Sequence, residues 1–314
     1  MNNDKTQCLA CNNTCASDGI LPLNLILDLY NKLFKLTWTE KEISDYSFND
    51  IESYTCSKCG LRQFSKAQPG PAGFYKKLAT ELSWYYPTVR WESKPVLSRI
   101  HKNDSVVEIG CGSGQFIHFA KKSGISITGL ELSEEAIERG KREGLCILHA
   151  SEAKKLSENF NFLLMFQVLE HLTDPFQFLK EHIHLVKKGG YIIVSVPMLH
   201  SICGYLPDPL SWPPHHITSW TKESLTELGK RLNVQLIEIQ EQPISPFFNQ
   251  MKLMRNLYSK VLTTFLYSNK PEWQEIELLR NLSTSFTPTV ALSLLKKQKW
   301  TRTFHSGFAV YKVN

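Results

Sequence analysis

The stretch VVEIGCGSG at residues 106–114 decides the fold of this chain. A short, mostly β-branched apolar run contains an acidic residue and is followed by three alternating glycines. The next residues, 115–122, read as a helix that Gly124 ends. A strand, a tight glycine turn and a helix in this order form the first unit of a nucleotide-binding α/β sheet. Glycines let the backbone approach a ligand that a Cβ would exclude, and the helix N-terminus offers it unpaired N–H groups.

The spacing of these glycines discriminates between cofactors. A dinucleotide fingerprint needs a third glycine where Gln115 stands, and the chain instead has Glu-x-Gly-x-Gly-x-Gly from residue 108 to 114. Alternating strands and helices continue after it, and the second strand, 125–131, ends in Glu131. An acidic side chain at that position can accept hydrogen bonds from both hydroxyls of a ribose. The pattern predicts a nucleoside-containing ligand.

Composition sets the class of protein. The chain has 314 residues, of which 42% are hydrophobic and 21% charged, with a net charge of +6, values that are ordinary for a soluble globular protein. The sequence contains no run of five basic residues, so it does not indicate a nucleic-acid partner. The polar N-terminus and the lack of a long apolar run predict neither a signal peptide nor a membrane span. Isolated cysteines in the sheet pattern favour the reducing cytosol, and a cytoplasmic location is expected.

Two Cys-x-x-Cys pairs mark the N-terminal region. Cys8 with Cys11 and Cys56 with Cys59 suit a tetrahedral zinc site with four thiolates. Cys15 is a further thiol that could replace one ligand of the first pair, and free thiols or a redox pair are the alternatives. A closed site of four thiolates has no open position for catalysis, so the zinc is expected to be structural.

A second group of motifs follows the first half of the sheet pattern. The run VLEHL at 168–172 precedes Asp174 and Pro175, which cap and open a helix with apolar residues every three or four positions. The run KKGG at 187–190 is expected to end that helix, and a strand is predicted over 191–196.

These motifs together resemble the class I S-adenosylmethionine-dependent methyltransferases, over about residues 95–240 and the last ten residues. The resemblance implies a Rossmann-like α/β sheet of seven strands with the last one antiparallel. It also implies S-adenosylmethionine as cofactor, with Glu108 near its amino group and the glycines along its methionine end. Ser151 stands where this family often has an Asp for the adenine amine. The cofactor-binding residues expected from the resemblance are Glu108, Gly110, Gly112, Gly114, Gln115, Glu131, Leu132, Ser151 and Gln167.

The layout of the whole chain is also similar to that of bacterial methyltransferases associated with surface-polysaccharide or secondary-metabolite pathways. Five regions are predicted: a zinc-binding region at 1–68, an aromatic helical connector at 69–104, the cofactor-binding core at 105–242, a helical insertion at 243–303, and the final strand at 304–314. The insertion is interpreted as a lid, a substrate-specific cap or an oligomer contact.

A stiff loop after the fifth strand supplies the catalytic candidates. Residues 207–220 contain four prolines, and His215 and His216 lie where α/β enzymes hold their ligands. One imidazole could take a proton from a hydroxyl acceptor, whereas the alternative role is loop packing. His171 is a weaker candidate for that base. The predicted function is methylation, by inference O-methylation, of a small molecule or glycan precursor. An RNA methyltransferase with zinc knuckles and a non-catalytic cofactor-binding scaffold or regulator are the alternatives.

Overall fold

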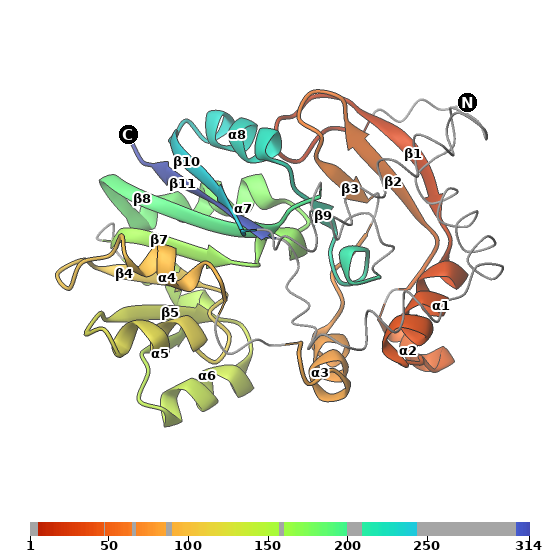
Figure 1. Cartoon of the computed structure of the whole chain (residues 1–314), viewed down its shortest axis with the longest axis horizontal. Coiled ribbons are helices and arrows are strands. Elements are labelled where there is room, and N and C mark those ends of the chain that lie inside the picture. Colours follow the sequence, from red (N-terminus) through yellow and green to blue (C-terminus); the bar gives the residue numbers. More distant parts are fainter. Residues whose placement is uncertain are drawn as a thin grey trace.

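The computed structural model describes residues 6–46, 48–64, 67–85, 90–156, 160–199, 209–243 and 306–314. Two sheets lie side by side in it, a sheet of seven strands and a sheet of four (Figure 1). Cys203 and all but the first residue of the predicted helical insertion lie outside the described residues. Within the described ranges, no helix is both long enough and apolar enough to cross a membrane.

The larger sheet has the strand order β10-β11-β8-β7-β4-β5-β6. Five strands run parallel, and β11 pairs antiparallel with both β8 and β10. All four residues of β4 are buried, as expected for a strand covered on both faces. The predicted α/β sheet of seven strands with an antiparallel last strand is confirmed. The bounds are β4 Val106–Ile109, β5 Ile127–Glu131, β6 Ile147–His149, β7 Phe160–Phe166, β8 Val186–Pro197, β10 Gln235–Glu241 and β11 Ser306–Lys312.

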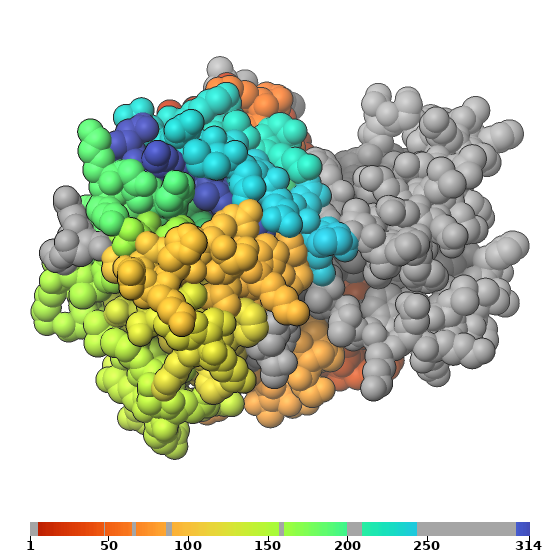
Figure 2. All heavy atoms as spheres, turned by 60° about the vertical axis from the view of Figure 1, so that its left-hand side comes forward, coloured from red at the N-terminus to blue at the C-terminus, as the bar shows by residue number. Residues whose placement is uncertain are grey.

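Helices cover this sheet, and short polar side chains start several of them. Ser133 accepts a hydrogen bond from the backbone N–H of Ala136, and Asp174 accepts one from that of Gln177. In the space-filling view, the segment with α4 and the residues after it (orange) lies against β10 (cyan), and Arg99 just after α4 pairs with Glu238 (Figure 2). The bounds are α4 Ser93–Leu97, α5 Gln115–Lys121, α6 Glu134–Arg142, α7 Pro175–His182 and α8 Lys222–Arg231.

The predicted end of α7 is wrong. The helix stops at His182, a 3₁₀ turn covers Ile183–Leu185, and β8 begins at Val186. The two glycines at 189–190 therefore lie inside a strand and exchange backbone hydrogen bonds with Val313. The apolar spacing misled the prediction because Leu185 and Val186, beyond the end of α7, are buried as well.

The smaller sheet has the order β1-β2-β3-β9, and every pairing in it is antiparallel. Its first three strands come from the N-terminal region, but β9 follows the histidine loop of the core. Helix α1 buries one apolar face, with Ile26 and Tyr30 fully buried. The bounds are β1 Cys15–Leu21, β2 Ile51–Cys56, β3 Arg62–Phe64, β9 Thr218–Ser219, α1 Leu23–Phe34, α2 Glu40–Asp45 and α3 Ala72–Glu81.

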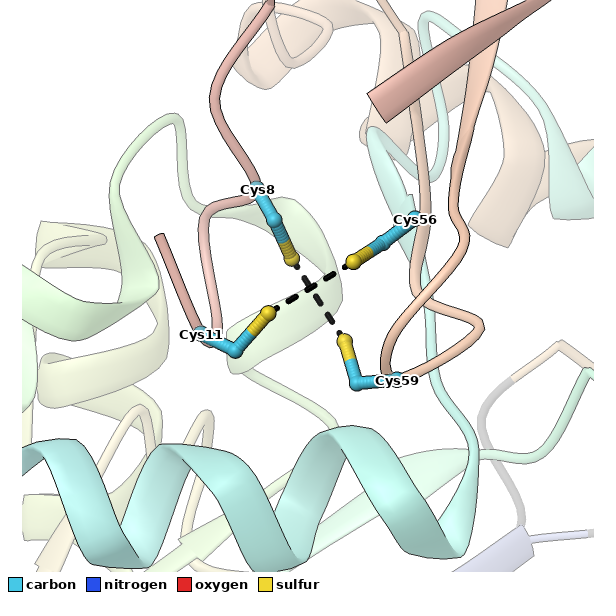
Figure 3. Close-up of side chains that lie close together, drawn as sticks. All are labelled: Cys8, Cys11, Cys56 and Cys59. Carbon is cyan, nitrogen blue, oxygen red and sulfur yellow. Dashed lines mark hydrogen bonds between the residues drawn. The ribbon is translucent and has the colours of Figure 1, made fainter. Parts of the chain in front are cut away.

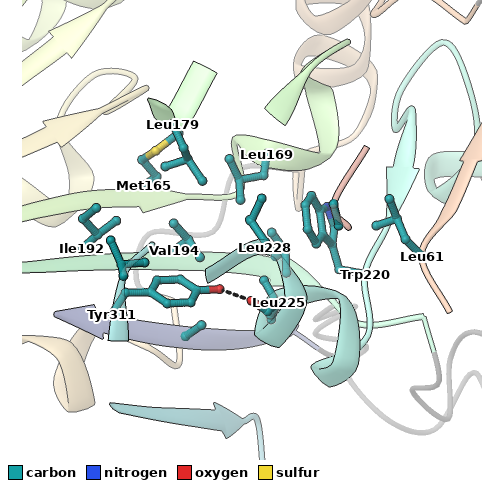
Figure 4. Close-up of a cluster of buried hydrophobic side chains, with 14 of the residues drawn as sticks. Leu61, Met165, Leu169, Leu179, Ile192, Val194, Trp220, Leu225, Leu228 and Tyr311 are labelled. Carbon is teal, nitrogen blue, oxygen red and sulfur yellow. Dashed lines mark hydrogen bonds between the residues drawn. The ribbon is translucent and has the colours of Figure 1, made fainter. Parts of the chain in front are cut away.

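The hydrophobic core runs without interruption from the large sheet to the N-terminal region. Trp220 is fully buried and belongs to one cluster with Leu61 beside the small sheet and Leu225 on α8 (Figure 4). The same cluster includes Cys8 and Cys59. Burial of this apolar surface joins the cysteine-bearing loops to the sheet that carries the glycine turn.

Candidate active site

The glycine turn after β4 has the backbone geometry that the sequence predicted. Gly110 and Gly112 have φ angles of +69° and +55°, which side-chain-bearing residues rarely adopt. A Cβ on Gly110 would lie 2.6 Å from Cγ2 of Val168, whereas the nearest atom to a Cβ on Gly112 is Oε1 of Gln115 at 3.6 Å. Gly112 therefore borders space that a ligand can use, and Gln115 opens the helix behind it.

Glu131 closes the other side of this turn. Its Oε2 accepts the backbone N–H of Gly112 at 2.7 Å, and its Oε1 accepts those of Leu132 and Ser133 at 2.7 and 3.0 Å. Leu132 is 72% exposed, beside the predicted ribose position. These charge-assisted bonds fix the carboxylate at the carboxyl end of β5, and its position suits the hydroxyls of a ribose.

Glu108 is the buried acid of the motif. It is 4% exposed, and its Oε2 has no hydrogen-bond partner. Burial raises the pKa of Glu108 to about 8, and the nearby Arg90 charge opposes that rise. A buried carboxyl group with an unsatisfied oxygen suits pairing with a cationic group such as the cofactor's amino group.

Gln167 follows β7 with a φ of +58°, and two residues that the sequence did not suggest hold it. Its Nε2 donates to Oγ of Ser195 at 2.9 Å, and that hydroxyl donates to Oε1 of Glu92 at 2.9 Å. Glu92 is 1% exposed and lies in the predicted connector. Its burial could not be read from the sequence, because its partner Ser195 comes from a distant strand of the large sheet.

Ser151 lies just after β6, in a 3₁₀ turn. Its hydroxyl and Nδ1 of His149 are 2.8 Å apart, and its backbone N–H donates to the same nitrogen at 3.3 Å. Because Nδ1 accepts the backbone bond, the Ser151 hydroxyl is the donor in the other. A contact of Ser151 with the adenine stays a prediction.

Three histidines form a cluster at the carboxyl edge of the large sheet. The His215 ring lies 4.2 Å from the His216 ring and 5.2 Å from the His171 ring, measured between centroids. Nδ1 of His215 lies 2.6 Å from the carbonyl oxygen of Leu210, which can only accept, so that nitrogen carries the proton. Nε2 then accepts the Tyr85 hydroxyl at 2.6 Å. Both ring nitrogens of His215 are thus engaged within the protein.

Burial keeps these imidazoles neutral. It lowers the pKa of His171 to about 4, and it lowers the pKa values of His215 and His216 well below the usual 6.5. Nδ1 of His171 donates to the carbonyl oxygen of His215 at 2.7 Å, so Nε2 bears the lone pair. A neutral imidazole can accept a proton, and all three are in that form at pH 7.

The four cysteines of the two knuckles converge on one point (Figure 3). The sulfurs of Cys8 and Cys59, and those of Cys11 and Cys56, are 3.5 Å apart. Tetrahedral zinc with Zn–S bonds of about 2.3 Å separates its sulfurs by roughly 3.8 Å, so this arrangement fits the ion. The hydrogen bond from Cys59 lowers the pKa of Cys8 to about 5, which favours a thiolate ligand. Cys15 is buried nearby, where burial raises its pKa, and it is not in the group of four.

A second set of ligand-type atoms lies in the histidine cluster. One atom each of Glu170, His171 and His216 lies within 4.8 Å of the others. Glu170 is fully buried, and neither of its carboxylate oxygens has a hydrogen-bond partner. Burial raises the pKa of Glu170 to about 8. These three side chains could hold a cation, although the sequence suggested only the histidines as functional groups.

Part of the chain is similar to known methyltransferases. Residues 89–239 match the family model described as a methyltransferase domain. The chain carries a methyltransferase domain, and its activity is S-adenosylmethionine-dependent methyl transfer. A ubiquinone biosynthesis O-methyltransferase of Coxiella burnetii (strain RSA 331 / Henzerling II) is 25% identical over 183 residues, covering 53% of this methyltransferase and 78% of the relative. The enzyme of the same name from Pelagibacter ubique (strain HTCC1062) is 25% identical over 197 residues, covering 57% and 79%.

Solved structures include a methyltransferase of Thermotoga maritima described as a possible histamine N-methyltransferase. It shares 18% identity with this methyltransferase and covers 77% of the chain and 96% of its own, with a TM-score of 0.46. The region that matches the methyltransferase domain begins at residue 89. It therefore includes Arg90 and Glu92, which lie before the region in which the sequence motifs resembled a methyltransferase.

Proposed function

We propose that this methyltransferase O-methylates a small molecule or a glycan precursor and that the histidine loop lies on the acceptor side of the site. The cluster of buried, neutral imidazoles at the carboxyl edge of the sheet carries this proposal. A hydroxyl is a poor nucleophile until it loses its proton, so an adjacent neutral base favours a hydroxyl acceptor. The relatives named above are called O-methyltransferases, which supports the same atom type. The layout with N-terminal cysteine pairs favours the glycan precursor.

The cofactor side of the proposal uses residues around the glycine turn. Glu108 pairs with the cofactor's amino group, Arg90 with its carboxylate, and Glu131 with the ribose hydroxyls. Arg90 suits this role because its positive charge is near enough to lower the pKa of Glu108. The guanidinium forms no close ion pair with that carboxyl group, so it can pair with the cofactor's carboxylate. Bound S-adenosylmethionine supplies a methyl group already activated by the sulfonium, so the protein mainly aligns the acceptor and excludes water.

The two predicted catalytic histidines receive different roles. His215 is held by Tyr85 and the Leu210 carbonyl, and it orients the loop. His216 packs against both other imidazoles, and we assign it as the group that takes the acceptor's proton. Because its pKa is lowered well below 6.5, the rate should not depend on its titration between pH 7 and 8.

The test is methyl transfer from labelled cofactor to a panel of phenolic and sugar-nucleotide acceptors, with product analysis by mass spectrometry. The expected product is a methyl ether. His216→Ala should lower kcat by about 10²–10⁴-fold while the affinity for S-adenosylhomocysteine stays unchanged. His184→Ala is the matched control, because His184 is exposed in the 3₁₀ turn after α7 and hydrogen-bonds to the nearby carbonyl oxygen of Glu181. An N-methyl or C-methyl product, or a normal turnover in His216→Ala, contradicts the assignment.

A further inference from the structure

The second knuckle, Cys56–Cys59, packs against the start of α8. The hydroxyl of Thr221 donates to the backbone carbonyl of Cys59 at 2.6 Å, and both residues are buried. A Cβ on the following Gly60 would lie 3.3 Å from Cγ2 of Thr221, and its φ of +69° suits glycine. Because the hydrogen bond from Thr221 to Cys59 is short and both residues are buried, a shift of the knuckle would break it unless Thr221 shifted as well.

The first knuckle, Cys8–Cys11, is tied to the other end of the same helix. Arg231 donates from Nη1 to the carbonyl oxygen of Leu9 at 2.9 Å. Its guanidinium carbon lies 3.5 Å from the ring centroid of Phe176 on α7. In this structure, therefore, both knuckles that bring the four sulfurs together are held by α8.

The histidine loop, called the acceptor loop from here on (residues 209–217), is bonded to the same part of the fold. Strand β9 follows it and pairs with β3, with Thr218 opposite Gln63. The backbone N–H of Ile217 donates to the carbonyl oxygen of Glu170 at 2.8 Å. The acceptor loop is thus held between the small sheet, which carries the second knuckle, and the turn that carries His171.

The cofactor-binding residues around the glycine turn are held by hydrogen bonds that do not involve the cysteine knuckles. The glycine turn hydrogen-bonds to Glu131, and Gly110 donates to the carbonyl oxygen of Leu130 at 2.8 Å. These bonds run between the ends of β4 and β5. They place the cofactor residues without using α8 or the small sheet.

We propose that a metal ion at the four cysteines sets the position of the acceptor loop, and that Thr221 transmits this as a positioning residue. The proposal rests on the proposed function for the loop's role at the acceptor. Metal binding draws the knuckles together, and the bond between Thr221 and Cys59 fixes the point where β9 passes into α8. The acceptor half of the site then depends on the metal, and the cofactor half does not.

The experiment compares the zinc-loaded full chain with Thr221→Val, Thr221→Ser and Ser224→Ala. Ser224→Ala is the matched control, because it removes the other half of the α8 capping box and leaves the bond from Thr221 to Cys59. Amide hydrogen exchange in peptides from 209–221 should be about tenfold faster in Thr221→Val, as for the loss of one buried hydrogen bond. Thr221→Ser should behave like the wild type. The zinc content and the affinity for S-adenosylhomocysteine should stay within twofold in all three.

Chelation of the wild type supplies the second arm. Removal of zinc should speed exchange across 209–221 while peptides from 108–132 keep their protection and the affinity for S-adenosylhomocysteine. Unchanged exchange of the loop, or an equal loss of protection in both halves, overturns the proposal. If exchange responds as expected but no hydroxyl acceptor is ever methylated, the coupling stands and the proposed O-methylation fails. With an acceptor identified, Thr221→Val should raise KM for the acceptor without changing that for the cofactor.

Discussion

The two halves of the candidate site are built in opposite ways. The cofactor half takes most of its residues from one short stretch, 108–132, and its parts bond to one another. The acceptor half draws on the connector with Tyr85, the turn with Glu170 and His171, and the loop with His216. A motif can encode the first half, because neighbouring strands of a parallel sheet bring its residues together. The second half exists only after distant segments have packed.

The largest expected effect concerns the metal that is proposed to hold the acceptor half. We expect about one zinc per chain in purified protein and its loss in Cys56→Ser, because apparent zinc affinities for such sites correspond to about 10–16 kcal/mol. The N-terminal region should loosen while the glycine turn stays protected. Elemental analysis and hydrogen exchange measure both results. Cys146→Ser is the control, since Cys146 is exposed and outside the group of four. Metal-free protein that was never exposed to a chelator would refute the zinc site.

A glycine substitution should break the cofactor half. Gly110→Ala combines a φ of +69° with a Cβ 2.6 Å from Val168, so we expect a loss of roughly 2–5 kcal/mol in unfolding free energy and no cofactor binding. Gly189→Ala is the matched control. Its φ is +77°, but nothing lies within 4 Å of its Cβ, so only the strain of about 1–3 kcal/mol remains. Equal effects in thermal unfolding would show that close packing at the turn contributes nothing.

Local signals explain what the sequence predicted. The strands of the large sheet, the cap at Asp174 and the φ angles of the glycine turn each depend on neighbours within a few residues. The two cysteine knuckles were also predictable from local sequence, because the spacing within each Cys-x-x-Cys pair determines the turn that it forms. Only their meeting is non-local, and the chemistry of thiolates made that meeting predictable.

The features that the sequence did not predict depend on contacts between residues far apart along the chain. Strand β9 has two residues and joins a sheet whose other strands come from the N-terminal region, so no periodicity could indicate it. Glu92 and Ser195 meet across the fold, and nothing near either residue shows it. The engagement of both nitrogens of His215 by Tyr85 and Leu210 is equally non-local, which is why the sequence could not separate its role from that of His216.

Glu131 gives a smaller effect that is confined to the cofactor half. Removing a charge-assisted hydrogen-bond acceptor costs about 1.5–3 kcal/mol, so Glu131→Ala should bind S-adenosylhomocysteine about tenfold to a hundredfold more weakly. Glu134→Ala, on the exposed first turn of α6, is the control and should bind normally. Calorimetry measures both. The acceptor loop should keep its hydrogen-exchange protection in each variant, and a change there would mean that the two halves are coupled after all.

The last effect is a pH dependence of the cofactor affinity, and it depends on Glu108. Burial raises its pKa to about 8, so the folded, cofactor-free protein holds this carboxyl protonated at pH 6. Pairing with the cofactor's ammonium needs the ionised form. The affinity for S-adenosylhomocysteine should therefore rise with pH, by up to about tenfold between pH 6 and 7 and by about a further fivefold between pH 7 and 8, and level off above pH 8. Glu108→Gln should bind more weakly at pH 8 and show no such rise.

The raised pKa of Glu108 also determines whether the stability of the fold rises or falls with pH. A carboxyl whose pKa is raised on folding stabilises the fold below its unfolded pKa, and this contribution is lost as the pH rises through about 8. Cofactor-free wild type should thus lose thermal stability between about pH 5 and 8 relative to Glu108→Gln.

Glu170→Gln separates the two buried acids, because the pKa of Glu170 is also about 8 but its carboxylate lies among the histidines. That variant should keep the pH dependence of cofactor affinity. If it abolishes the rise and Glu108→Gln does not, the cofactor's amino group lies in the acceptor half, and the division of the site into two halves is wrong.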